Sequence, residues 1–224
     1  MYCAVCTRPD IAYAVSVATR FLSDYGKQHV KYVKRIIRYL AGTTSYCLQF
    51  KLNTSEEIIL LIMSDSSYAD DKVNRRSTYG FNIYLDNNLV SWKSKLTTPI
   101  ALSTMEAELF GACEGVKEGV WIRKIYEFMT SKKVARTILK VDNRATKDFI
   151  LNGKISNRSK HIEIRYHYLQ ELVRKGTLEV EWIRGDENCA DIHTKGLPQA
   201  THEKHCLKML DCQKGNHNVK HGGV

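Results

Sequence analysis

The chain has 224 residues, 43% of them hydrophobic and 26% charged, and its formal net charge is +10. This composition excludes a disordered chain, and seven cysteines at irregular spacing exclude a secreted disulfide framework. The longest clean aliphatic run, Ile58 to Met63, is too short to span a bilayer, and no signal peptide is recognisable, so we expect a soluble intracellular protein without membrane contact.

The first 55 residues are predicted to be helical, with helices starting near Pro9 and at Lys27. In the second helix, over 27–40, apolar residues recur at spacings of three and four and so share one face. These residues are Val30, Val33, Ile37 and Leu40. Eight cations against two anions before Glu56 place +6 of the net charge here. The cations of the second helix form either a solvated face or a surface laid against a phosphate backbone.

From residue 58 onward the pattern changes to strands alternating with helices. Strands are predicted at 58–64, 79–85 and 89–94, with Asp86-Asn87-Asn88 as the hairpin turn between the last two, because Asn and Asp tolerate positive φ. A long helix follows from about Thr104 to Met129. A strand at 138–141, a short helix to about 151, a helix at 161–175, a strand at 178–183 and a short helix near 189 complete the series. This order predicts an α/β fold, a mixed sheet with helices on its faces.

Four acids stand where the predicted strands end or helices begin: Asp65, Glu108, Asp142 and Asp191. One acid at such a place is usually a cap or a turn former. Four in an otherwise basic chain indicate a site, because gathered carboxylates repel one another unless a cation joins them. Hard oxygen ligands suit Mg²⁺, and two such ions stabilise both the attacking and the leaving oxygen of a phosphodiester.

Two neighbouring glutamates have different predicted roles. Ser103-Thr104-Met105-Glu106 matches a capping box, with Ser103 as the N-cap and Glu106 three positions on. Glu108 points roughly 200° around the helix from Glu106. Glu108 is therefore free to face a metal.

Nine short motifs follow one another along the chain. They are Thr7-Arg8-Pro9-Asp10-Ile11-Ala12, Lys34-Arg35-Ile36-Ile37-Arg38-Tyr39-Leu40, Ser64-Asp65-Ser66, Arg76-Ser77-Thr78, Ser91-Trp92-Lys93-Ser94-Lys95, Glu106-Ala107-Glu108, Val141-Asp142-Asn143, Ser159-Lys160-His161-Ile162 and Ala190-Asp191-Ile192-His193-Thr194-Lys195. In these residues and their order, about residue 5 to residue 198 resembles the carboxy-terminal part of the Pol polyprotein of copia-type retrotransposons. The motifs together are very specific.

The resemblance implies a ribonuclease H-like, mixed five-stranded sheet with flanking helices at 56–198. A helical leader at 1–55, resembling the end of the reverse transcriptase, precedes it, and a polar tail at 199–224 follows. The implied activity is endonucleolytic cleavage of RNA in RNA–DNA hybrids during reverse transcription. The implied metal ligands are Asp65, Glu108, Asp142 and Asp191, holding two Mg²⁺ ions, with Mn²⁺ as an alternative.

The expected partners are an RNA–DNA hybrid and the polymerase part of the same Pol. We expect a cytoplasmic location within virus-like particles, with the nucleus as the alternative. Seven cations are predicted to contact the nucleic-acid backbones: Lys93, Lys95, Arg158, Lys160, Lys34, Arg35 and Arg38.

Some residues depart from the family pattern. Ser66-Ser67-Tyr68 replaces the usual second Asp and Trp after the first aspartate. The loop Gly185–Asn188 lacks the mobile His that cellular ribonucleases H carry, and we interpret His193 as a helix residue rather than its substitute. The polymerase's catalytic motif is absent, so reverse transcription by this chain alone is not expected.

Other functions stay open on the sequence. A catalytically inactive nucleic-acid-binding fragment needs only the basic surface, and a transposase-like nuclease could use the same fold. The tail offers either a zinc site or a solvated segment. Its candidate ligands are His202, His205, Cys206, Cys212, His217 and His221.

Overall fold

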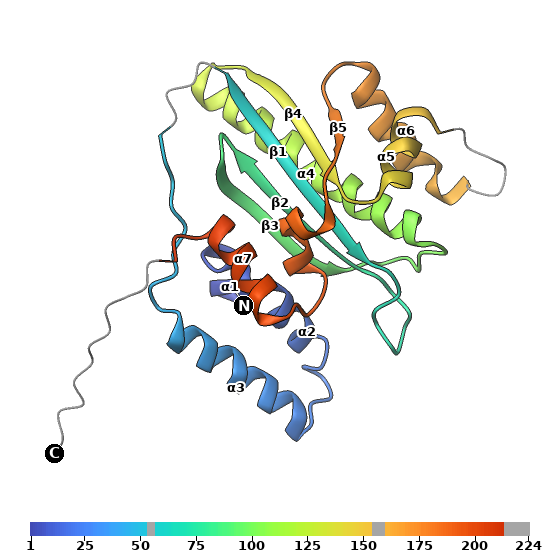
Figure 1. Cartoon of the computed structure of the whole chain (residues 1–224). Coiled ribbons are helices and arrows are strands. Elements are labelled where there is room, and N and C mark those ends of the chain that lie inside the picture. Colours follow the sequence, from blue (N-terminus) through green and yellow to red (C-terminus); the bar gives the residue numbers. More distant parts are fainter. Residues whose placement is uncertain (53–56, 154–159, 213–224) are drawn as a thin grey trace.

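A mixed five-stranded sheet forms the centre of the molecule (Figure 1). The computed structural model describes residues 1–52, 57–153 and 160–212. The strands are β1 (Ile58–Ser67), β2 (Thr78–Leu85), β3 (Asn88–Leu96), β4 (Val134–Val141) and β5 (Glu179–Trp182). Their spatial order in the sheet is β3-β2-β1-β4-β5. Strand β2 pairs antiparallel with both β1 and β3, and β4 pairs parallel with both β1 and β5. This confirms the predicted mixed five-stranded sheet with flanking helices.

Local signals in the sequence explain two of the element boundaries. The β2–β3 turn places Asp86 (φ 53°) and Asn87 (φ 64°) in the left-handed region, as their residue types predict. Helix α4 (Thr104–Thr130) begins after Ser103, whose side chain accepts a hydrogen bond from the Glu106 N–H at 3.2 Å. Both features lie where the sequence predicted them.

Three helices cover one face of the sheet: α4, α5 (Arg144–Asn152) and α6 (Lys160–Arg174). Alternate β1 residues such as Leu60 and Ile62 point to this face and are fully buried. They pack with Leu109 and Val116 of α4 in the main apolar core. Burial of this face fixes which β1 side chains point the other way, Asp65 among them.

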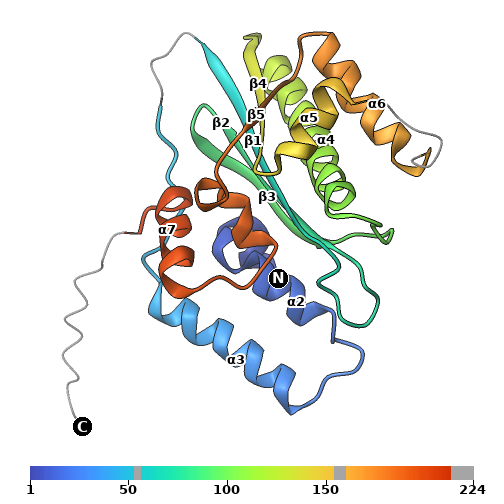
Figure 2. The same cartoon turned by 45° about the vertical axis from the view of Figure 1, so that its right-hand side comes forward.

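The opposite face is covered by segments from both ends of the chain, as Figures 1 and 2 both show. They are α1 (Tyr2–Cys6), η1 (Pro9–Ile11), α2 (Ala12–Thr19), η3 (Gly185–Glu187), η4 (Cys189–His193) and α7 (Gln199–Met209). Helix α3 (Lys27–Gly42) packs against α2, farther from the sheet. A second apolar cluster joins η4 and α7 to the sheet, with Ile192 and Met209 among its buried residues and Tyr46 and Leu48 packed against it.

Packing crosses both predicted domain boundaries. The prediction of a polar tail from 199 is wrong for 199–212, because α7 buries His205, Cys206 and Met209 against the sheet and Cys47 forms a β-bridge with Asp211. Apolar residues three and four apart within a polar segment gave α7 one face to bury. The rest of the predicted tail, 213–224, lies outside the described residues.

A buried ion pair anchors the leader. Arg8 donates to both carboxylate oxygens of Asp10, at 2.9 and 2.7 Å, and to the Thr43 carbonyl at 3.1 Å. Tyr39 of α3 donates to the same carboxylate at 2.7 Å. The Thr-Arg-Pro-Asp motif is therefore the point at which the leader helices are held together.

Helix α3 leaves its apolar face in solvent. Val30, Val33 and Ile37 are exposed, Ile37 at 59%, and no residue of α3 is buried. The helix packs against α2. No helix of the described residues is long and apolar enough to cross a membrane.

Candidate active site

Four separate elements bring the predicted acids to one place. Asp65 lies in β1, Glu108 in the second turn of α4, Asp142 directly after β4, and Asp191 in η4. Asp65, Asp142 and Asp191 each offer a carboxylate oxygen, and these three atoms lie within 4.8 Å of one another. Acids separated by 126 residues of sequence thus form one cluster.

Glu108 joins this cluster from α4. It is only 5% exposed, and its Oε2 atom is buried without a hydrogen-bond partner. Glu106 points elsewhere, and its carboxylate accepts a hydrogen bond from the Leu102 N–H at 2.6 Å. Glu106 thus bonds the backbone one residue before Ser103, the predicted partner in a capping box, and it points away from the acid cluster.

Electrostatics at the site favour the protonated acids. Burial, and then the charges of Asp65 and Asp142, raise the pKa of Glu108 well above its ordinary value. Burial and Asp65 also raise the pKa of Asp142, and they raise that of Asp191 to about 7. Packing several carboxylates together out of water opposes their ionisation. A cation among them would reverse this.

Neighbouring side chains fix the orientation of the acids. Thr194 donates a hydrogen bond to Asp65 Oδ2. Asn188 donates to the Ser64 carbonyl at 2.9 Å, and its oxygen caps η4 by accepting from the Ala190 N–H at 3.2 Å. These contacts tie the start of η4, and with it Asp191, to the strand that carries Asp65.

A close backbone approach holds η4 on the sheet. A side chain at Gly80 of β2 would place its Cβ 2.4 Å from His193 Cβ, nearer than packed atoms come. Gly80 stands directly opposite Asp65 in the register of β1 and β2. A glycine is needed here because η4 rests on the backbone of β2.

Lys195 is a site residue that sequence reasoning missed. Its ammonium lies 3.0 Å from Asp191 Oδ1 and 3.7 Å from Asp65 Oδ2. Burial lowers the pKa of Lys195, but the attraction of Asp65 and Asp191 outweighs it and raises that pKa. The spacing of four residues between Asp191 and Lys195 was the available signal.

The predicted nucleic-acid contacts fall in several places. Lys93 and Lys95 are exposed on the edge strand β3. The Lys93 ammonium lies 5.8 Å from the Phe81 ring, which faces α4. Lys95 is two residues further along the strand and therefore points to the same face, away from Asp65. The leader cations Lys34, Arg35 and Arg38 are exposed on α3. Arg158 and the side chain of Lys160 lie outside the described residues. A binding role for these seven stays a prediction.

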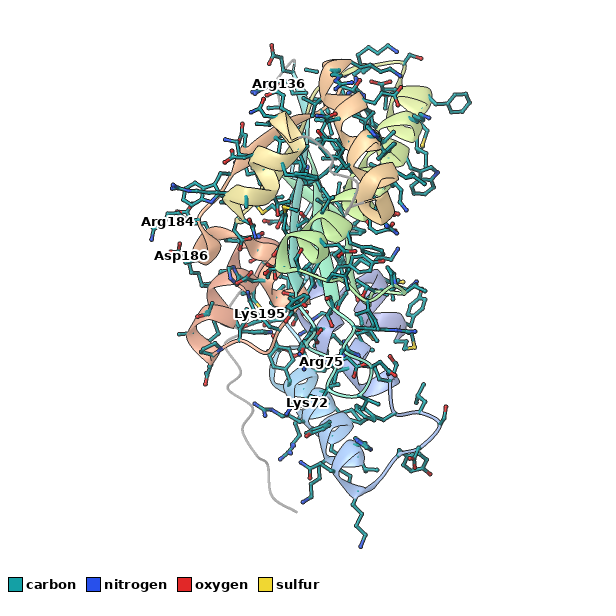
Figure 3. All side chains as sticks on the ribbon, turned by 90° about the vertical axis from the view of Figure 1, so that its right-hand side faces the viewer. Lys72, Arg75, Arg136, Arg184, Asp186 and Lys195 are labelled. Atoms are coloured by element: carbon teal, nitrogen blue, oxygen red, sulfur yellow. The ribbon has the colours of Figure 1, made fainter. Side chains whose placement is uncertain are left out.

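Further cations appear above and below Lys195 in one view of the molecule. In the view of Figure 3, Lys195 lies between Arg184 and Asp186 above it and Lys72 and Arg75 below it. Lys72 and Arg75 belong to the loop that follows β1. These positions were not among the predicted contacts, because a loop's position in space does not follow from its own sequence.

Ser66, which departs from the family pattern, and His193, which follows the loop without the mobile His, both have structural roles. Ser66 points to the α4 face, where it donates to the Ala107 carbonyl at 2.8 Å. His193 is fully buried and bonds Asn82 Oδ1 through Nε2 at 2.6 Å, and burial lowers its pKa to about 3. His193 therefore lies in η4 and faces the interior, in keeping with its interpretation as a helix residue rather than a substitute for the mobile His.

The acid cluster fits a divalent metal. Its donors are hard carboxylate oxygens, and the buried, unpartnered oxygen of Glu108 is a ligand atom without another role. Among the described residues, the His and Cys side chains of α7 form no group of three metal-ligating atoms. His217 and His221 of the suggested zinc cluster lie outside the described residues.

Comparison with known proteins reveals relatives over nearly the whole chain. The chain is 40% identical over 199 residues to the retrovirus-related Pol polyprotein from transposon TNT 1-94 of Nicotiana tabacum, covering 89% of this chain and 15% of that protein. It is 30% identical over 203 residues to the polyprotein from transposon RE1 of Arabidopsis thaliana, covering 91% of this chain and 14% of that protein. The secreted RxLR effector protein 161 of Plasmopara viticola is 41% identical over 123 residues, 54% of this chain and 84% of that protein. No protein-family model matches.

Solved structures give weaker similarity. The N-terminal RNase H domain of rv2228c from Mycobacterium tuberculosis aligns with a TM-score of 0.46 at 13% identity, over 67% of this chain and 98% of that one. LC11-RNase H1 in complex with an RNA/DNA hybrid aligns with a TM-score of 0.42 at 11% identity, over 62% of this chain and 94% of that one.

Proposed function

Because the chain belongs to the copia-type retrotransposon Pol family, we propose that it is the ribonuclease H of such a polyprotein, a Mg²⁺-dependent endonuclease acting on RNA–DNA hybrids. The chain spans about 15% of the length of these relatives, so the proposal concerns this part alone. The observation that carries it is the convergence of three aspartates from three elements, with Glu108 of α4 close enough to feel the charges of Asp65 and Asp142 and with a buried oxygen left without a partner.

The four acids would hold two divalent ions, Mg²⁺ or Mn²⁺. Bound ions supply positive charge that stabilises the attacking and leaving oxygens of a phosphodiester. Thr194 and Asn188 hold Asp65 and the start of η4 in place, which is the preorganisation that such chemistry needs. The expected products carry a 3′-hydroxyl and a 5′-phosphate.

The cations around the cluster would contact the phosphate backbones of the hybrid. Lys72, Arg75 and Arg184 lie on the same side of the molecule as Lys195 (Figure 3). Contacts of this kind read the shape of the duplex and its 2′-hydroxyls, so we expect little sequence preference. The polymerase part of the same Pol is the proposed partner that delivers the hybrid.

Cleavage of a labelled RNA strand by the full chain tests the proposal. We expect Mg²⁺-dependent cutting of RNA in the hybrid and none of double-stranded RNA or DNA. Asp65→Asn and Asp142→Asn should reduce cutting to the level of a protein-free control. The matched control is Asp186→Asn, which removes an exposed acid paired with Arg184 at 3.0 Å beside the site.

Two other outcomes would replace the proposal. Hybrid binding without cleavage, unchanged by Asp65→Asn, would indicate an inactive nucleic-acid-binding fragment. Cleavage of double-stranded DNA that depends on the same acids would indicate a transposase-like nuclease. Normal cleavage of the hybrid by either Asn variant would remove the metal-ligand assignment.

A further inference from the structure

The ammonium of Lys195 lies inside the carboxylate cluster. It contacts Asp191 Oδ1 at 3.0 Å and Asp65 Oδ2 at 3.7 Å. In the part of the chain that the structure describes, these are the ion pairs that reach the four acids. The Lys195 N–H also donates to the Asp191 carbonyl at 3.4 Å, so a short local turn sets the pairing.

Both contacted acids are ones that a metal would need. A divalent cation and an ammonium at contact distance from the same carboxylate oxygens repel each other, and the repulsion is strong where water is scarce. Only 4% of the Asp65 side chain and 12% of the Asp191 side chain are exposed. The contacts of Lys195 and metal coordination by these oxygens therefore exclude each other.

Lys195 has room to move aside. Its side chain is 45% exposed, and in Figure 3 it lies between Arg184 and Arg75 in height. A long, flexible stem lets the ammonium turn outward while the backbone of η4 stays in place. The outward position lies among the cations proposed to meet the phosphates of the hybrid.

We propose that Lys195 is a resident counter-ion of the cluster, which offsets repulsion among the acids and competes with divalent cations for Asp65 and Asp191. This rests on the proposed function, because it takes these acids as the metal site. Metal entry releases the ammonium toward the phosphate backbone of the substrate. The four acids then bind metal less tightly than they would without Lys195.

Metal titration without nucleic acid tests this directly. We compare Mn²⁺ binding to the wild-type chain and to Lys195→Met by calorimetry at low salt. Loss of two partly exposed ion pairs should tighten Mn²⁺ binding by roughly five- to tenfold. In EDTA the variant should melt at a lower temperature than the wild type, and Mn²⁺ should raise its melting temperature more.

Three further variants separate the effect of the charge from the effect of losing the side chain. Lys204→Met removes a similarly exposed lysine that pairs with Asp186 at 3.6 Å, and it should leave Mn²⁺ affinity unchanged. Lys195→Arg keeps the charge and should keep affinity near that of the wild type. Lys195→Gln serves as the neutral variant if Lys195→Met does not fold, as judged by circular dichroism.

Unchanged or weaker Mn²⁺ binding by the folded neutral variant would overturn the inference, as would no Mn²⁺ binding by either protein. Hybrid cleavage is measured separately. Tighter Mn²⁺ binding by a chain that cuts no hybrid would support the counter-ion and reject the proposed function. Normal cleavage by the wild type with equal Mn²⁺ affinities would reject the counter-ion alone.

Discussion

Replacing Asp191 with Asn should stabilise the protein at high pH in the absence of metal. Burial, together with the charge of Asp65, raises the pKa of Asp191 from 3.8 to about 7. An acid with a raised pKa holds its proton more tightly in the folded chain than in the unfolded one. Its contribution to stability is complete below about pH 4 and is lost as the pH rises toward 7. An Asn side chain does not ionise, so the variant lacks the free-energy cost of holding a buried negative charge beside Asp65 at high pH.

The size of the effect follows from the shift. Three pKa units correspond to about 4 kcal/mol at 1.36 kcal/mol per unit. Solvent screening and loss of the Lys195 ion pair reduce the gain, so we expect about 1–2 kcal/mol at pH 8 and none near pH 4. The gain should develop between these two values, where the folded protein binds the extra proton.

Urea unfolding in EDTA at pH 4.5 and pH 8 measures this difference. The control is Asp186→Asn, which removes an exposed acid and should show no gain at pH 8. A saturating concentration of Mn²⁺ should reverse the order, because metal binding then stabilises the wild type. A gain of the same size at both pH values, or a less stable variant at pH 8, would refute the electrostatic reasoning.

Four other variants probe the two glutamates of α4, the leader and the basic helix. Glu108→Gln should abolish hybrid cleavage. Glu106→Gln should leave cleavage unchanged and lower the free energy of unfolding by about 1 kcal/mol or less. The reverse ranking of the two variants in cleavage would mean that the wrong glutamate was assigned to the site. Arg8→Leu should cost about 3–5 kcal/mol in the free energy of unfolding, because it leaves the buried Asp10 carboxylate without its ion pair; a loss under 1 kcal/mol would contradict the anchoring role. If α3 binds the phosphates of the hybrid, replacing three of its cations with Gln should make affinity depend less steeply on salt. The slope of log affinity against log salt concentration should fall by close to one unit for each lost phosphate contact, and an unchanged slope would exclude this binding role. The three positions are Lys34, Arg35 and Arg38.

The sequence by itself determined the element order and the four acids. The spacing of apolar residues along the strands and helices is a local property of the sequence, and so are the Asp86-Asn87 turn and the Ser103 cap. The structure shows each of these features where it was predicted. The choice of Glu108 over Glu106 also followed from helix geometry alone. Local spacing carries this information because each side chain's direction depends on its own backbone.

The tertiary structure decided which distant segments of the chain pack together on the second face of the sheet. The polar composition of 199–212 predicted a solvated tail, but the second face of the sheet needed cover and α7 supplied it, together with the leader. The position of the Lys195 ammonium between Asp65 and Asp191 depends on η4 docking against Gly80, a contact with His193, 113 residues further along the chain. Such contacts are set by packing between distant segments, which no local pattern in the sequence records.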